Sequence, residues 1–106
     1  MQLAELQSHI EMLIDDLGWS SARSPWPRTP RNMATSVMVE AAELLEHFQW
    51  GDEIRDRDAL AAEMADVLIY LLQLATVSDI DLEAAALDKL AFNRRRFTPL
   101  APERRE

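Results

Sequence analysis

The chain contains no cysteine, so it can form neither a disulfide scaffold nor a thiolate metal site. It also has few basic residues: 11 Lys and Arg stand against 19 Asp and Glu, which gives a formal net charge of −8. Non-specific nucleic-acid binding depends on a broad basic surface, and this composition does not supply one. We therefore expect no nucleic-acid partner.

Long apolar runs are missing as well. No run approaches the roughly 18 uninterrupted apolar residues that indicate a membrane span, so we expect no membrane partner. The opening segment MQLAELQSHIEMLIDDLGW has acidic residues within its apolar pattern and no basic start, unlike a secretion signal. The expected location is the cytoplasm.

The apolar pattern that is present predicts an all-α fold with four main helices. Hydrophobic residues make up 48% of the 106, which is enough for the core of one domain. Three of the five prolines fall within residues 19–30, which predicts a loop there. We expect a domain over residues 1–98, a flexible tail over 99–106, and helices over 2–17, 31–48 and 58–77, with a fourth that is capped by Asp79 or Asp81 and ends near Phe97.

Two pairs of carboxylates at helical spacing are the strongest functional signal. Glu40 and Glu43 are three residues apart, and so are Glu63 and Asp66, so each pair projects from one face of one helix. From Met64 to Val77 the third helix is apolar almost all round, as in a helix buried on most sides. Carboxylates in such surroundings cost several kcal/mol each unless they are paired or bind a metal.

Two such helices that face each other would direct four carboxylates at one point. Mg²⁺ prefers oxygen ligands and commonly bridges protein carboxylates to substrate phosphates, so this point suits Mg²⁺. The alternative is that the acids lie on ordinary solvated helix faces. Tyr70 follows Asp66 by four residues and is expected either at the same site or in the core with a satisfied hydroxyl.

The acidic motifs and their order resemble those of the all-α nucleotide pyrophosphohydrolases. That superfamily includes MazG-like enzymes, dimeric dUTPases and phosphoribosyl-ATP pyrophosphohydrolase. The finer resemblance is to the dCTP pyrophosphatase-like branch of the MazG-like group. It rests on E-x-x-E, E-x-x-D and three further stretches: TPRN at 29–32, ELLEHFQW at 43–50 and DKLAFNRRRF at 88–97.

The resemblance implies a hydrolase that converts a nucleoside triphosphate and water to a nucleoside monophosphate and pyrophosphate. Its substrates would be (d)CTP-like or modified nucleotides in a house-cleaning role. Glu40, Glu43, Glu63 and Asp66 would hold Mg²⁺, with Mn²⁺ as a substitute, and Glu43 or Glu40 would take a proton from the attacking water.

The resemblance also implies which residues bind the substrate. Lys89 and Asn93 would lie near the triphosphate or the nucleoside, and Arg96 is the nearest match to a basic family position. Trp50 would line the base pocket, and Trp26, in the loop before TPRN, would close over the base. Arg28 stands where many relatives have a histidine, in a region that helps to shape this pocket. Trp19 follows Gly18 and is interpreted as a packing residue at the helix end.

Two alternatives to this function remain open. Within the superfamily, the chain would be a relative of phosphoribosyl-ATP pyrophosphohydrolase or of dUTPase. Outside it, the chain would be a non-catalytic helical interaction module whose acids select a partner. We also expect a homodimer or homotetramer, because the third helix is more apolar than one layer of neighbours can cover.

Overall fold

The computed structural model describes residues 2–19 and 24–97. Within them the chain forms four helices and no strand, so the predicted all-α fold is confirmed. The helices are α1 (Leu3–Asp16), α2 (Pro30–Glu46), α3 (Arg57–Val77) and α4 (Leu82–Phe97). Each predicted boundary falls within two residues of the observed one. The proposed tail at 99–106 lies outside the described residues, so the domain boundary at 98 stays a prediction.

Side-chain caps explain why three of the helices begin where they do. The Thr29 side chain accepts a hydrogen bond from the Asn32 backbone N–H, and Pro30 takes the first helical position of α2. Asp56 caps α3 in the same way. Asp81 accepts from the Ala84 N–H at the start of α4, so Asp81 is the cap, while Asp79 turns the chain with a φ of 55°.

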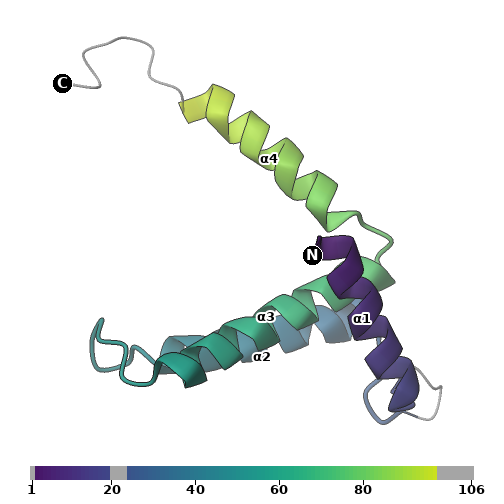
Figure 1. The fold of residues 1–106 in the computed structure, drawn as a ribbon, viewed down its shortest axis with the longest axis horizontal. Coiled ribbons are helices and arrows are strands. Elements are labelled where there is room, and N and C mark those ends of the chain that lie inside the picture. Colours follow the sequence, from purple (N-terminus) through teal and green to yellow (C-terminus); the bar gives the residue numbers. More distant parts are fainter. Residues whose placement is uncertain (1, 20–23, 98–106) are drawn as a thin grey trace.

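Helices α2 and α3 run side by side, and α1 packs across the C-terminal half of α3 (Figure 1). The core between α1 and α3 consists of Ile10, Ile14 and Leu72, with Ile69 and Leu82 packed against it. This arrangement leaves the N-terminal half of α3 paired with α2. The carboxylates of both helices lie along that pairing.

The apolar surface of α3 is covered only in part. Leu72 and Ala75 are buried, but Met64 is 56% exposed and Leu68 is 37% exposed. The expectation that this helix is buried on most sides is therefore not met within one chain. By length and hydropathy alone α3 would also qualify as a membrane-spanning helix. In this structure four of its residues are buried against protein: Leu60, Leu72, Gln73 and Ala75.

Helix α4 projects away from the α2–α3 pair (Figure 1). None of its residues is buried, and Leu87, Leu90 and Phe97 are each at least 60% exposed. The helix therefore presents an apolar surface that the rest of the described chain does not cover.

Candidate metal and nucleotide site

Three carboxylates from two helices meet between α2 and α3. One oxygen each of Glu40, Glu43 and Glu63 lies within 4.8 Å of the other two, a spacing at which one cation can contact all three. Glu40 and Glu43 come from successive turns of one face of α2, and Glu63 comes from the second turn of α3. The i, i+3 spacing in the sequence thus brings these groups together as expected.

Asp66, the fourth predicted ligand, is exposed and does not belong to this three-carboxylate cluster. It still lies close enough to raise the pKa values of Glu40 and Glu63 electrostatically. The structure therefore places it beside the cluster, one turn further along α3 than Glu63. Asp66 as a ligand stays a prediction.

The cluster holds its negative charges at an energetic cost. Burial, followed by repulsion from Glu43 and Glu63, raises the pKa of Glu40 from 4.5 to about 7. Burial and the charge of Glu43 also raise the pKa of Glu63, and the nearby His47 opposes this shift. The site therefore favours either a proton or a cation.

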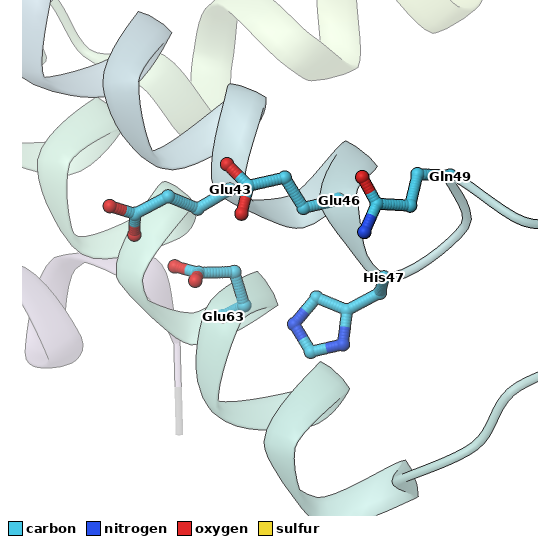
Figure 2. Close-up of a pocket in the computed structure, with 5 residues that line it drawn as sticks. All are labelled: Glu43, Glu46, His47, Gln49 and Glu63. Atoms are coloured by element: carbon cyan, nitrogen blue, oxygen red, sulfur yellow. The ribbon is translucent and has the colours of Figure 1, made fainter.

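One oxygen of the cluster has no partner in the part of the chain that the structure describes. Oε2 of Glu63 is buried and has no hydrogen-bond partner among the described residues. Buried polar atoms are nearly always satisfied, so this oxygen has the capacity to accept a proton or to bind a cation. Glu63 borders a cavity of about 430 Å³, and the carboxylates of Glu43 and Glu63 turn to the same side (Figure 2). His47 lines this cavity too, in keeping with the four-residue step from Glu43.

Two of the predicted substrate-binding aromatics lie on the other side of the cluster. Trp26 and Tyr70 line a shallow hollow together with Glu40. The indole N–H of Trp26 donates to the Ser36 hydroxyl at 3.2 Å, which fixes the ring beside α2. The structure therefore places an aromatic surface next to a carboxylate of the cluster.

The same two aromatics line a second, less open cavity of about 240 Å³, the aromatic cavity. Met33 is fully buried at its wall, and Arg28 and Gln73 supply polar groups. The cavity's lining consists of Trp19, Ser24, Pro25, Trp26, Arg28, Met33, Tyr70 and Gln73.

Trp19 is interpreted from the sequence as a packing residue at the helix end, and its side chain is covered only in part. Its side chain is 56% exposed and borders the aromatic cavity, because the backbone turns at Gly18, with a φ of 73°, and directs Trp19 back toward residues 24–26. Trp50 is 78% exposed and lies in a separate hollow with His47 and Arg55, beyond the C-terminal end of α2.

A polar network on the aromatic cavity was not foreseen from the sequence. Arg28 donates two hydrogen bonds to the Glu11 carboxylate, at 2.9 and 2.7 Å, and one from Nε to Gln73 Oε1 at 3.2 Å. Gln73 follows Tyr70 by three residues and so shares a helix face with it, which was the available signal. Its partner Arg28 lies 45 residues away along the chain, and Glu11 lies 17 residues from Arg28, so local spacing could not reveal these contacts.

The residues predicted on α4 are not brought to the cluster within one chain. The Lys89 ammonium lies 4.9 Å from the centre of the Phe92 ring, and the Arg96 guanidinium lies 4.8 Å from that of Phe97. Asn93 is half-buried on the same helix. Since α4 projects away from α2 and α3, these contacts remain within the helix (Figure 1).

Comparisons with known proteins show what this chain resembles. A model of the MazG-like family matches residues 35–99, which contain all three carboxylates of the cluster. Over 77 residues the chain is 43% identical to human dCTP pyrophosphatase 1 and 40% identical to the bovine protein of the same name. These matches cover 64% of this chain but only 45% and 46% of the relatives, so the chain spans less than half of their length.

A solved structure shares the fold over nearly the whole chain. A pyrophosphatase from Archaeoglobus fulgidus superposes with a TM-score of 0.77 at 34% sequence identity. The alignment covers 92% of this chain and 93% of the archaeal one. The spatial arrangement of the helices is therefore one that a pyrophosphatase also uses.

The raised pKa of Glu40 makes a prediction about pH and stability in metal-free protein. Because the folded state holds this proton up to about pH 7 and the unfolded state releases it near 4.5, the contribution of Glu40 to the free energy of unfolding falls as pH rises through this window. Glu40→Gln, which cannot lose a proton, should therefore gain stability over the wild type between pH 4.5 and 7, as measured by urea unfolding with EDTA present.

Glu46→Gln is the matched control, because Glu46 lines the larger cavity but lies outside the three-carboxylate cluster. Its stability should follow the wild-type pH dependence. Parallel curves for Glu40→Gln and the wild type would show that Glu40 does not carry the shift.

Proposed function

The chain belongs to the MazG-like family, and we propose that it is a nucleotide pyrophosphohydrolase that converts an NTP or dNTP and water to a nucleoside monophosphate and pyrophosphate. The observation that supports this most is the three-carboxylate cluster with its orphaned Glu63 oxygen. The names of the relatives, dCTP pyrophosphatase 1 and a pyrophosphatase, point to the same chemistry. The proposal includes a house-cleaning role on (d)CTP-like or modified nucleotides, and a cytoplasmic location.

We propose Mg²⁺ as the cofactor, with Mn²⁺ as a substitute. Glu40, Glu43 and Glu63 supply hard oxygen ligands within reach of one another, and Asp66 lies beside them. An acidic protein of net charge −8 repels a triphosphate, so a cation at the cluster also explains how the two associate. When bound, the cation supplies charge neutralisation for the phosphates and acidifies water.

Residues of this chain then accept the proton and bind the base. Glu40 or Glu43 accepts a proton from the attacking water, the role of a positioned carboxylate base. Trp26 and Tyr70, beside Glu40, offer an aromatic surface for the base, and stacking on such a surface contributes about 1–3 kcal/mol. Trp50, which lies beyond the C-terminal end of α2, is a further candidate for contact with the base. No nucleophilic cysteine exists in the chain, and direct attack by water requires none.

A second copy of the chain completes the site in this proposal. Lys89, Asn93 and Arg96 do not reach the carboxylates of their own chain, and α4 presents an uncovered apolar face. Exposed apolar surface on α2 and α3, at Met38, Leu45 and Met64, is available to receive it. Packing of α4 from one copy near α2 and α3 of another would bury both surfaces and bring the basic and amide groups to the phosphates.

The test of the activity is the substitution Glu63→Gln. It keeps the size of the side chain but removes a charge from the cluster, so pyrophosphate release should fall by at least a hundredfold with the helical content intact. Mg²⁺ should raise the melting temperature of the wild type but not of the variant. The substrate panel contains canonical and modified dNTPs and NTPs, dUTP and phosphoribosyl-ATP, with both products identified.

Asp58→Asn provides the control, since Asp58 is an exposed acid in the first turn of the same helix. This variant should retain turnover and the response to Mg²⁺. Full activity in Glu63→Gln, or no release of pyrophosphate by the wild type from any substrate, would refute the proposed function. Mg²⁺-independent stability together with no turnover would favour the helical interaction module.

The shared site makes a separate prediction about mixed oligomers. Glu63→Gln and Lys89→Gln should each be inactive alone, because one lacks the cation site and the other lacks the phosphate contact. When the two are unfolded, mixed and refolded, a dimer of one of each contains one site with intact carboxylates and an intact lysine. In an equal mixture, half of the dimers should contain one copy of each variant, and one of the two sites in such a dimer should be intact. About a quarter of wild-type activity should therefore return.

Mixing either variant with itself is the control and should restore nothing. No recovery in the mixture, or a monomer by light scattering that is fully active, would show that each chain acts alone. Lys89 would then have to reach the carboxylates by a movement of its own α4.

A further inference from the structure

The guanidinium of Arg28 connects the segment before α2 to two helices. Arg28 is bonded through both terminal nitrogens to Glu11 of α1 and through Nε to Gln73 of α3, so it joins three parts of the chain. The paired side chains of Arg28 and Glu11 are only 13% and 31% exposed. A bidentate arginine–carboxylate pair fixes the plane of the guanidinium as well as its position.

The fixed guanidinium determines how the amide of Gln73 is turned. An Nε–H can only donate, so the amide atom facing it has to be the oxygen. The NH₂ group of Gln73 therefore faces away from Arg28. Gln73 is only 8% exposed, and among the described residues Arg28 is its one hydrogen-bond partner.

That NH₂ group belongs to a residue that lines the aromatic cavity. Gln73 and Arg28 border the cavity together with the rings of Trp26 and Tyr70 and the buried side chain of Met33. At about 240 Å³ the cavity is smaller than the roughly 300–1,000 Å³ that holds a whole drug-sized ligand, so it suits one part of a nucleotide. Aromatic walls with one oriented donor are what a nucleobase requires.

The cavity also lies in the right place relative to the cluster. Trp26 and Tyr70 line both the aromatic cavity and the hollow that includes Glu40. A nucleotide whose phosphates are held at the carboxylates could therefore extend its base between these aromatics.

We propose that Gln73 is a specificity-determining residue that donates a hydrogen bond to a carbonyl oxygen of the substrate base, and that Arg28, anchored by Glu11, is its positioning residue. This rests on the proposed function and deepens it. The substrate class is a nucleoside triphosphate whose base presents a carbonyl oxygen to the cavity, as pyrimidines do. Arg28 acts through Gln73: its Nε–H occupies the amide oxygen, which leaves the NH₂ group of Gln73 to donate to the base.

The test compares dTTP with its apolar shape mimic, the triphosphate of difluorotoluene deoxyriboside, which fills the same space without carbonyl oxygens. One hydrogen bond contributes about 1 kcal/mol, so wild-type kcat/KM should favour dTTP about fivefold to tenfold. Gln73→Leu should reduce this preference to near one by lowering kcat/KM for dTTP alone. Gln73→Glu is the second variant in case the first does not fold: it keeps a partner for Arg28 but removes the donor, and should also abolish the preference.

The positioning role has its own readout. Arg28→Lys removes the Nε donor, so the preference for dTTP should fall as it does in Gln73→Leu, mainly through KM. The double variant should be no worse than Gln73→Leu alone, because both changes remove one interaction. Arg31→Lys, an exposed arginine in the first turn of α2, is the matched control and should keep the wild-type preference.

The outcomes separate the two proposals. A wild type that hydrolyses no nucleotide refutes the proposed function. A wild type that is active but treats dTTP and its mimic alike, or a preference that survives both changes at Gln73, overturns the role of Gln73. The remaining outcome is that Arg28→Lys lowers kcat/KM equally for dTTP and its mimic, with an effect that adds to that of Gln73→Leu. That result would show that Arg28 only stabilises the fold.

Discussion

The repulsion among three carboxylates held within 4.8 Å of one another is the constraint on which the rest of this structure depends. A protein that places Glu40, Glu43 and Glu63 together without a counterion forfeits stability, as the raised pKa values of Glu40 and Glu63 show. The packing of α2 along α3 has to offset this cost. Divalent cations would turn the repulsion into binding energy, which is why the same feature that weakens the bare fold supports a function.

Helices and a loop position different parts of the site. Because residues three apart share a face, one face of α2 supplies two carboxylates and α3 supplies the third. The aromatics need a different element: Trp26 comes from the loop, fixed by Ser36 on one side, while the Arg28–Glu11 pair anchors the loop on the other. Rigid helices thus position the charged groups, and a tied loop forms the wall beside them.

The periodicity of the sequence predicted the features that depend on residues close together in the chain. It located the four helices within two residues, the Asp81 cap among two candidates, and the faces on which the carboxylates meet. It could not foresee the Arg28–Gln73 contact or the position of Trp19, because both depend on how the loop folds back over α3. Nor could it say that α4 would leave Lys89 remote from the carboxylates, since helix spacing specifies a face but not the angle at which a helix leaves its neighbour.

The central claim, that the three-carboxylate cluster is a cation site, is tested most directly by anomalous scattering from crystals grown with Mn²⁺. The account predicts a manganese peak in contact with the carboxylates of Glu40, Glu43 and Glu63, including the oxygen of Glu63 that has no protein partner among the described residues. Oxygen ligands at near-octahedral positions, with water filling the rest, would identify a site of the magnesium type. Crystals that show manganese elsewhere and none at the cluster would contradict the account.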